Sequence, residues 1–397
     1  MRVGMDTIFS QGPSAAVGIG NYSFGFVSHL AEHPDVDLFL LHADPTSQGY
    51  VQALSHFILA NNLDIFHLTT PAETPLEAFI SYTLPPVRLV ATVYDTIPLK
   101  YPDVYLPADE NKAQYHQKLQ VLRHAHRLLA ISENTRTDFI DAGFDPNKIV
   151  NIGTGTDQCF FPRKDISLNA LPKGFPTDKP FVLAFNPADF RKNADRTVEA
   201  FCIATRDAAE DYQLVFTSGA YQALQDDLRR IADRQGRAGS VHFVGQVTKS
   251  QLLGLYNRTE ALLFPSLYEG LGLPVLEAMQ CGTPVLASDV SSLPELAGDA
   301  VVYVDPTDVL SIASGIRRIL FEPSLRTHLR HMGLARAQRF TWSGVVAKAV
   351  VEYHRLMDEV QISGEQWGVP PNAKRNTAVG RKRPYLAYPF FRNAKQP

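Results

Sequence analysis

The chain has 397 residues, of which 45% are hydrophobic and 20% charged, and its formal net charge is -3. A single hydrophobic core rarely grows beyond about 250–300 residues, so this length predicts two domains. The charge balance argues against a general nucleic-acid binder, which would carry a strong basic excess, and no run of about 18 apolar residues is present to span a membrane.

The N-terminal half alternates short apolar runs with segments of helical apolar spacing. Strands are expected at residues 2–6, 36–43, 64–70, 88–95 and 126–132. Helical patterns lie between several of them, at residues 21–33, 111–125 and 132–143. Because strands that alternate with helices form a parallel sheet with helices on both faces, this half predicts a doubly wound α/β domain.

The alternation stops at residues 165–180, DISLNALPKGFPTDKP, whose Pro, Gly and Asp content is typical of a linker. It restarts with strands expected at residues 181–186, 212–218, 241–245, 261–265 and 283–288. Helices are expected between them, at residues 194–205, 224–236, 250–259 and 274–282. The sequence thus predicts two doubly wound α/β domains in tandem, with no sequence-level repeat between them.

A last amphipathic helix is expected at residues 340–360, and the composition changes after it. Residues 361–397 contain seven Lys or Arg and one acidic residue, together with WGVPP and PYLAYPFF. The expected organisation is a domain at 1–168, a domain at 176–340, a C-terminal helix at 341–360 and a basic aromatic tail at 361–397. The tail could meet an anionic membrane surface, or it could pack on the protein or stay disordered.

The segment FPSLYEGLGLPVLEAMQCGTPV, residues 264–285, carries two carboxylates eight positions apart, Glu269 and Glu277. It joins the carboxyl end of an expected strand to a helix, with Pro274 suited to the first helical position and Gly282 to the helix end. In open α/β sheets, ligands bind at the carboxyl ends of the strands. The segment is therefore the first candidate for a binding site.

The loop between the two carboxylates is suited to an anion. Gly270 and Gly272 let the backbone approach a ligand closely, and free N–H groups at the positive end of the helix favour a phosphate. Glu277 is expected in the first turn of that helix. Two carboxylates would repel a phosphate, so they are better placed to accept hydroxyl groups on either side of it, as a nucleotide-sugar would require. The alternative is that Glu277 only faces the helix dipole and Glu269 is a solvated loop charge.

E-x7-E with GLGLPVLEAM between the glutamates resembles the signature of the retaining GT-B glycosyltransferases of family 4, which includes bacterial mannosyltransferases and sucrose synthase. Other segments similar to this family occur in its order, at residues 17–31, 92–102, 128–140, 148–157, 190–193, 241–256 and 291–306. The resemblance covers roughly residues 1–357. It implies a GT-B fold, in which two Rossmann-like domains face each other across a cleft and the final helix packs back on the first.

The resemblance also implies roles for residues of this loop and of the domains. The first domain would bind the acceptor and the second the nucleotide-sugar. Glu269 would bind donor-sugar hydroxyls and Glu277 the ribose. Gly270 and Gly272 would bind the sugar and diphosphate, with Leu271 and Leu273 serving through backbone or apolar contact.

Arg191 and Lys192 follow the first strand of the second domain, where cations could clamp a diphosphate. The resemblance assigns this role most securely to Lys192. Many relatives carry a further Arg five residues before this pair, where this chain has Asn186. Clamping would then rely more on Arg191 and on backbone amides. Two adjacent cations could also form an ordinary solvated loop.

GIGNYS has the Gly-x-Gly of a dinucleotide fingerprint but lacks its last glycine, and it starts too far after the first strand for a tight turn. We therefore reject a dinucleotide site. The expected role is that Gly18 and Gly20 present their amides to the donor phosphate from the first domain. A flexible loop without a ligand is the alternative.

Asp95 ends an expected strand and faces the cleft. Many relatives place a His before this Asp, where this chain has Tyr94, which can donate a hydrogen bond but cannot readily act as a cation near pH 7. The hypothesis is that Asp95 orients an acceptor or donor hydroxyl and that Tyr94 fills the His site. The alternative is that Asp95 only caps the following turn.

No metal site is expected. Asp35 and Asp37 form a D-x-D, which binds a divalent metal in other transferases, but here it leads directly into an apolar strand. No cofactor is expected beyond the nucleoside-diphosphate sugar itself. The helix dipole and basic residues would stabilise the leaving diphosphate in place of a metal.

The cellular location is expected to be cytoplasmic. The first residues, MRVGMDTIFSQGPS, lack the apolar region of a signal peptide. Three cysteines without a CxxC pair suit a reducing compartment better than a disulfide framework. The tail leaves open a peripheral position on the inner face of the membrane.

The resemblance implies a retaining, metal-independent transferase that moves a hexosyl group to a hydroxyl of a glycan or lipid-linked glycan in surface or exopolysaccharide synthesis. DTIPLKYP resembles bacterial mannosyl- and rhamnosyltransferases, which favours GDP-mannose as the donor. A GT-B sugar-nucleotide epimerase and a non-catalytic GT-B scaffold stay open. Tyr94 and Asn186 favour the scaffold. The intact Glu269, Glu277 and Lys192 argue against it.

Overall fold

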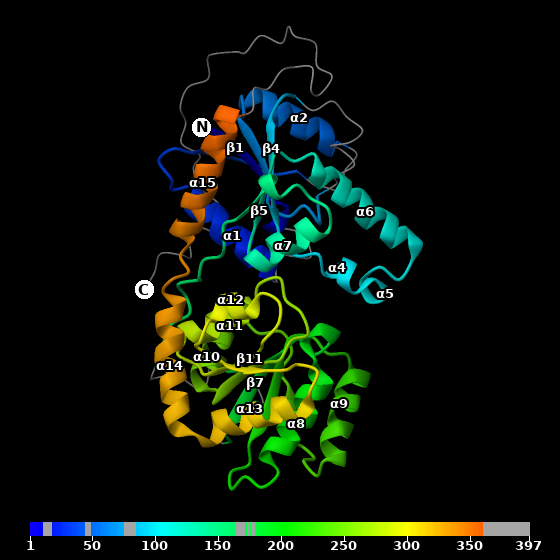
Figure 1. Ribbon diagram of the computed structural model, residues 1–397, viewed down its shortest axis with the longest axis vertical. Coiled ribbons are helices and arrows are strands. Elements are labelled where there is room, and N and C mark those ends of the chain that lie inside the picture. The colour runs from blue at the N-terminus through cyan, green and yellow to red at the C-terminus, as the bar shows by residue number, and fades with distance from the viewer. Residues whose placement is uncertain are drawn as a thin grey trace.

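The computed structural model describes residues 1–10, 18–43, 49–74, 85–163, 171–172, 175 and 179–359. Most of the predicted linker and the whole basic aromatic tail at 361–397 lie outside the described residues. Two halves lie one above the other (Figure 1), each built around a six-stranded sheet. The predicted α/β fold with two doubly wound sheets is confirmed. None of the helices within the described ranges is long and apolar enough to cross a membrane.

The first sheet is parallel throughout and has the strand order β2-β1-β3-β4-β5-β6. Its strands are β1 (Arg2–Asp6), β2 (Asp37–Leu41), β3 (Ile65–Leu68), β4 (Arg88–Val93), β5 (Arg127–Ala130) and β6 (Ile149–Asn151). Every residue of β3 and β5 is buried. Helices therefore cover both faces, as continuous apolar strands of a parallel sheet require.

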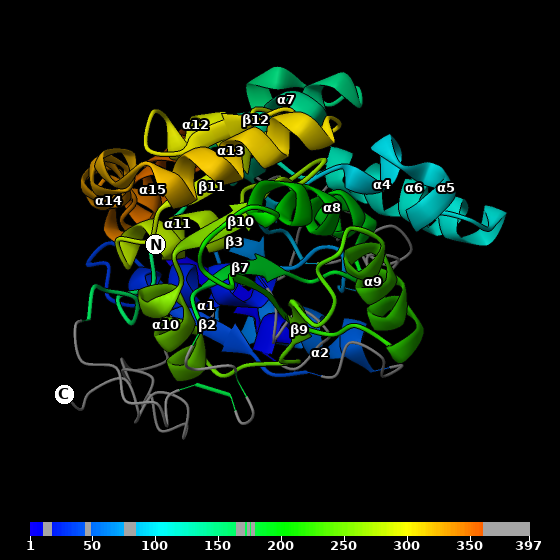
Figure 2. The same cartoon turned by 90° about the horizontal axis from the view of Figure 1, so that it is seen from below.

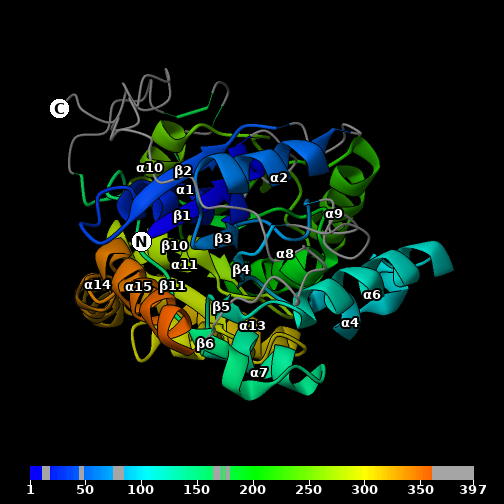
Figure 3. The ribbon, with the colours of Figure 1, turned by 90° about the horizontal axis from the view of Figure 1, so that it is seen from above.

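Alternate strand residues point to opposite faces of the first sheet, and each face packs against its own helices. One face packs on α2 (Tyr50–Ala60) and α6 (Asp109–Arg123). The other packs on α1 (Gly18–Leu30) and the C-terminal helix α15 (Trp342–Glu359), and Figure 3 shows α2 and α15 on opposite sides of the strands. The remaining helices of this half are η1 (Ile8–Ser10), α4 (Ile97–Lys100), α5 (Pro102–Tyr105), α7 (Glu133–Asp141) and η3 (Pro146–Lys148).

The second sheet is also parallel and has the order β12-β11-β10-β7-β8-β9. Its strands are β7 (Phe181–Phe185), β8 (Gln213–Thr217), β9 (Val241–Phe243), β10 (Ala261–Phe264), β11 (Val285–Ser288) and β12 (Val302–Val304). The helices on one face are α8 (Ala194–Thr205), α9 (Gln222–Arg234) and α13 (Val309–Phe321). Those on the other are α10 (Lys249–Arg258), α11 (Leu273–Gln280) and α12 (Leu293–Ala297), and Figure 2 shows this half from below.

The chain crosses between the halves near its C-terminal end. Helix α14 (Pro323–Ala337) packs on α11 in the second half, and α15 continues along the same side of the molecule onto the first half (Figure 1). Trp342, the first residue of α15, is buried, with its ring 5.0 Å from that of Tyr22. A Cβ atom on Gly25 or Gly155 would lie within 2.4 Å of the indole, so both glycines leave the space that Trp342 fills.

A buried ion pair fixes α15 to β5. Arg127 Nε lies 3.1 Å from Glu352 Oε2, and the two side chains are only 8% and 4% exposed. Glu352 also pairs with Arg355, at 2.5 Å, but that arginine is 59% exposed. Removing one partner of a buried pair leaves the other charge uncompensated, so Arg127 is the partner on which α15 depends.

We expect Arg127→Met to lower the free energy of unfolding by about 3 kcal/mol, because the buried Glu352 would keep only the exposed Arg355 as its partner. Arg355→Met removes that exposed partner and should cost less than about 1 kcal/mol. Urea denaturation followed by circular dichroism measures both variants. Equal losses would contradict an anchoring role for the buried pair.

Candidate functional site

The loops at the carboxyl ends of the two sheets meet between the halves. Ser132, which caps the N-terminus of α7 after β5, donates a hydrogen bond to the carbonyl oxygen of Gly270 at 2.7 Å. The hydroxyl of Tyr268 donates to the carboxylate of Asp138, in α7, at 2.7 Å. The loop that follows β10 is therefore held by the first half as well as by the second, and the candidate site lies where the two halves touch.

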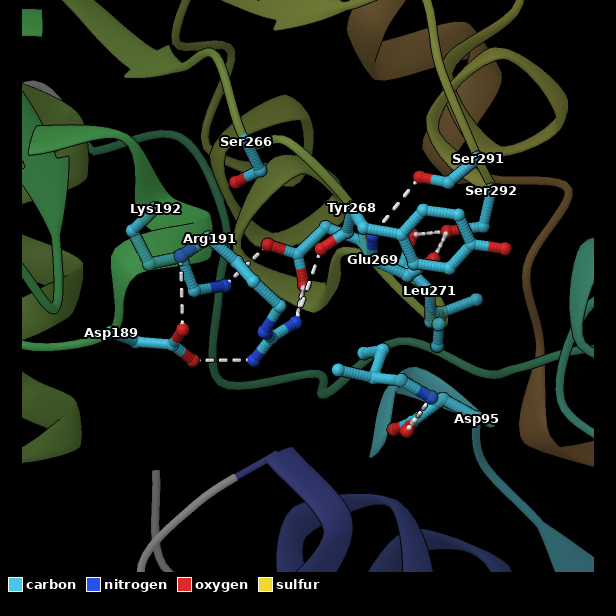
Figure 4. Close-up of polar contacts among 12 residues, drawn as sticks. Asp95, Asp189, Arg191, Lys192, Ser266, Tyr268, Glu269, Leu271, Ser291 and Ser292 are labelled. Carbon is cyan, nitrogen blue, oxygen red and sulfur yellow. Dashed lines mark hydrogen bonds and ion pairs between the residues drawn. The ribbon is translucent and has the colours of Figure 1, made fainter. Parts of the chain in front are cut away.

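Glu269 lies in this loop with its side chain only 9% exposed, so it is not a solvated charge. Its Oε1 lies 2.5 Å from Lys192 Nζ, and its Oε2 lies 3.8 Å from Arg191 Nη1 (Figure 4). The backbone N–H of Glu269 donates to the hydroxyl of Ser291 at 3.0 Å, and its carbonyl oxygen accepts from Ser292 at 3.0 Å. Hydrogen bonds thus fix the backbone of Glu269, and its carboxylate is paired with cations.

Arg191 and Lys192 end the 3-10 helix η5 (Phe190–Lys192), which follows β7 and is capped by the side chain of Asp189. Arg191 forms an ion pair with Asp189 and donates to the carbonyl oxygen of Tyr268 at 3.1 Å. Burial acts to lower the pKa of Arg191, but Glu269 and Asp189 outweigh it and hold that pKa above its usual value. Lys192 Nζ also lies 4.6 Å from the centre of the Phe264 ring. The two predicted cations therefore meet the predicted glutamate.

Both glycines of the loop lie in close contact with other parts of the protein, and their role toward a ligand stays a prediction. A Cβ atom on Gly270 would lie 2.5 Å from the carbonyl oxygen of Tyr94. Gly272 has a φ of +101°, and a Cβ there would lie 2.6 Å from Leu293. Leu271 is buried between them, and its carbonyl oxygen accepts from Ser292 at 2.9 Å. Protein atoms already fill the Cβ positions of both glycines.

The N-termini of α1 and α11 converge beside the loop. Gly18 and Gly20 lie in the first turn of α1, and a Cβ on Gly18 would lie 3.7 Å from Cδ1 of Leu273, the first residue of α11. Helix α11 has no side-chain cap at Gly272. The first N–H groups of a helix have no partner within it, so two positive helix ends, one from each half, point toward one region.

Glu277 lies in the second turn of α11, not in the first as predicted, because the helix begins at Leu273 and Pro274 is its second residue. Gly282, with a φ of +70°, follows the helix end as predicted. The carboxylate of Glu277 is half-buried and accepts a hydrogen bond from the hydroxyl of Tyr256 at 2.9 Å. Burial raises the pKa of Glu277 to about 7.

This raised pKa predicts a pH dependence of stability. The folded state holds a proton on Glu277 that the unfolded state releases near pH 4.5, so the stabilisation is full below pH 4.5 and is lost as the pH rises through about 7. We expect Glu277→Gln to gain about 3 °C in Tm relative to wild type between pH 5 and pH 8. Asp6, whose burial also raises its pKa to about 7, is common to both proteins and cancels. A difference in Tm between the two proteins that stays constant from pH 5 to pH 8 would contradict the raised pKa of Glu277.

Tyr94 and Asp95 lie directly after β4, against the loop of the second half. The hydroxyl of Tyr94 donates to the carbonyl oxygen of Thr69 at 2.8 Å, and burial raises its pKa. Oδ1 of Asp95 accepts from the N–H of Ile97 at 3.0 Å, so it does cap the following turn, and burial raises its pKa as well. Arg191 and Glu269 are among the charges that act on Asp95.

Sequence reasoning missed several residues that hold the predicted ones in place. They are Tyr105, Ser132, Asp138, Asp189, Tyr268, Ser291 and Ser292. Five of them follow a strand of either sheet within a few residues, or cap the helix that comes next. The rule that ligands bind at the carboxyl ends of parallel strands could have drawn attention to these. Tyr105 and Asp138 had no such signal, because they lie in helices farther from the strand ends.

A cavity of about 250 Å³ opens behind the loop, where α14 passes into α15. Leu271 is the predicted site residue that lines this cavity. Other lining residues are Ser132, Glu295, Arg339 and Lys348. It lies away from the carboxylate of Glu269, so it is not the candidate site. Within the described part of the chain, no group of three or more His, Cys, Asp or Glu side chains is arranged to hold a metal ion.

Both halves of the chain match known protein families. Residues 8–158 match the family described as Glycosyltransferase Family 4, and residues 169–335 match Glycosyl transferases group 1. The O-antigen chain mannosyltransferase B of Escherichia coli is 30% identical over 272 residues, which are 68% of this chain and 71% of that protein. The serotype-specific mannosyltransferase WbdA of Escherichia coli is 28% identical over 70% of this chain, but the match spans only 34% of WbdA.

Solved structures with low sequence identity share the fold. Sucrose-phosphate synthase from Thermosynechococcus elongatus matches with a TM-score of 0.70 and 21% identity, covering 91% of this chain and 100% of that one. The Anabaena protein HepE, solved in complex with UDP and glucose, matches with a TM-score of 0.68 and 17% identity over 90% of this chain and 100% of that one. These similarities support the GT-B arrangement of two facing sheets.

Proposed function

This chain belongs to the group 1 glycosyltransferases of family 4, and we propose that it transfers a hexosyl group, with retention of configuration, from a nucleoside-diphosphate sugar to a hydroxyl of a glycan or lipid-linked glycan. The observation that carries the proposal is the contact of Glu269 with Lys192, where the loops after β10 and β7 meet the first half. A buried carboxylate beside two cations and two open helix ends offers acceptors for hydroxyls next to a site for a diphosphate.

The nucleotide-sugar donor would bind mainly to the second half. Lys192, with the positive ends of α11 and α1, would bind the diphosphate, and Glu269 would turn from Lys192 to the sugar hydroxyls. Glu277, the fifth residue of α11, would accept the ribose hydroxyls, and Arg191 would add positive charge near the diphosphate. The first half would hold the acceptor, with Asp95 orienting a hydroxyl at the end of β4.

In the proposed reaction, the bond between C1 of the sugar and the diphosphate oxygen breaks, and the acceptor oxygen forms a new bond to C1. The acceptor proton passes to the departing diphosphate or to water. Negative charge develops on the leaving diphosphate, so donors and positive charge already aimed at it lower the barrier. Lys192, Arg191 and the N–H groups at the start of α11 are this chain's candidates for that role.

GDP-mannose is the proposed donor, and polysaccharide synthesis on the cytoplasmic side of the membrane the proposed setting. Support comes from the relatives, which include O-antigen mannosyltransferases of Escherichia coli and Salmonella typhimurium. Contact of the basic aromatic tail with an anionic membrane remains part of the proposal. Co-sedimentation of liposomes with the full chain and with residues 1–360 tests it, and equal binding of both removes it.

A thermal-shift screen with GDP, UDP, dTDP and ADP tests donor binding. A ligand at about 100 times its Kd adds about 2.7 kcal/mol of stability, so the donor's nucleotide should give a clear rise in Tm. GDP is expected to give the largest rise. No rise with any of the four would favour a non-catalytic scaffold, and conversion of a sugar nucleotide without acceptor would favour an epimerase.

A further inference from the structure

Residues 97–123 form an arm of the first half, made of α4, α5 and α6, which reaches beside the second half (Figure 1). Tyr105, the last residue of α5, contacts η5 and its cap. Its hydroxyl donates to Oδ1 of Asp189 at 2.8 Å and accepts from Nε of Arg191 at 2.6 Å. Phe190, between these two, packs edge-on against Tyr101 with ring centroids 5.0 Å apart. The arm thus holds the residues that immediately precede Lys192.

The bond from Tyr105 decides where the rest of the guanidinium points. The five N–H groups of arginine are fixed in one plane, so a hydrogen bond at Nε sets the direction of the other two nitrogens. Here Nη1 faces the carbonyl oxygen of Tyr268 at 3.1 Å and lies 3.8 Å from Glu269. Nη2 pairs with Asp189. Without the hydroxyl, Asp189 is the strongest remaining partner and can draw the guanidinium away from Glu269.

Tyr105 is suited to hold this bond. Its side chain is half-buried, its ring lies 5.7 Å from the Arg191 guanidinium carbon, and burial raises its pKa to about 12, so it stays a neutral hydroxyl at physiological pH. It accepts from the arginine and donates to the carboxylate at once. A phenylalanine would keep the ring contacts and lose both hydrogen bonds.

We propose that Tyr105 is a positioning residue which, from the first half, holds Arg191 at the diphosphate subsite of the second half and so couples donor binding to the arm. This inference rests on the proposed function. By thermodynamic linkage, a nucleoside diphosphate that binds Arg191 stabilises the docked arm as much as the docked arm favours the nucleotide. The coupling should depend on contacts with the second phosphate of the nucleotide and not on contacts with its nucleoside.

Calorimetric titration of Tyr105→Phe with a nucleoside diphosphate and with its monophosphate tests the inference. The pair used is GDP and GMP, or that of whichever nucleotide gives the largest thermal shift. We expect diphosphate binding to weaken about tenfold, the effect of one charge-assisted hydrogen bond, while monophosphate binding changes less than about twofold. Equal losses for both would indicate a merely structural role and overturn the inference.

Tyr101→Phe is the matched control, because Tyr101 lies in the same arm and, like Tyr105, packs on the ring of Phe190. It should bind both nucleotides as wild type does. Amide hydrogen exchange adds a second readout: the diphosphate should slow exchange in residues 97–123 of wild type but not of Tyr105→Phe. Wild type that binds no diphosphate overturns the proposed function together with this inference. Wild type and Tyr105→Phe that bind it equally overturn the inference alone.

Discussion

Replacing Glu269 by glutamine is expected to lower kcat/KM for sugar transfer by at least about 10²-fold. Glutamine keeps the shape of the side chain and can still accept a hydrogen bond from Lys192, so the loop should keep its conformation. It loses the negative charge and half of the acceptor capacity offered to the sugar hydroxyls. Initial rates of nucleotide release in the presence of donor and acceptor measure the effect.

The control for this variant lies at the other end of the same strand. Glu260 directly precedes β10, as Glu269 follows it, and pairs with Arg326 at 2.9 Å. Glu260→Gln removes the same charge from an ion pair away from the candidate site, in which the Glu260 side chain is 37% exposed, so its activity should stay within about twofold of wild type. Glu269→Gln with wild-type activity would contradict a role of Glu269 in the reaction, and an equal loss in both variants would indicate general destabilisation.

Lys192→Gln is expected to weaken binding of a nucleoside diphosphate by ten- to a hundredfold, about 1.4–2.8 kcal/mol. Lys192 is the cation closest to Glu269, and its side chain is only 14% exposed, so its charge is weakly screened by water. The corresponding monophosphate should lose much less affinity, because the second phosphate is the group that Lys192 is proposed to contact. Titration calorimetry at two salt concentrations measures both affinities.

Lys112→Gln serves as the control for this loss of charge. Lys112 lies on α6, is 46% exposed and pairs only weakly, at 3.5 Å, with Asp109. Its replacement should leave both affinities unchanged, since exposed pairs contribute little. A Lys192→Gln protein that binds the diphosphate as tightly as wild type would remove Lys192 from the diphosphate subsite.

The fold could be read from the sequence because its signals are local. The predicted strands are short apolar runs, several of them followed by a helical pattern, and β3, β5 and β10 are buried along their whole length. Strands β6 and β12, of three residues each, were not predicted. Parallel sheets with both faces covered require such continuous apolar strands. The start of α11 was less well predicted, because a proline is tolerated at either of the first helical positions and the spacing alone does not separate them.

The candidate site was less predictable, because much of it depends on contacts between distant segments. Glu269 and Lys192 were found as residues that follow strands, but their 2.5 Å contact joins positions 77 apart in the chain. The two glycines illustrate the limit more clearly. Gly270 and Gly272 suggested a ligand, whereas their Cβ positions face Tyr94 and Leu293. Sequence spacing cannot tell a close approach of protein from a close approach of substrate.

Incubation of the full chain with GDP-mannose and a mannosylated glycan, with the products followed by NMR, tests the proposed transfer directly. We expect release of GDP, a new glycosidic bond on the glycan with the anomeric configuration of the donor, and loss of both in Glu269→Gln. A product of inverted configuration, a new sugar nucleotide formed without the glycan, or equal turnover by wild type and Glu269→Gln would contradict it.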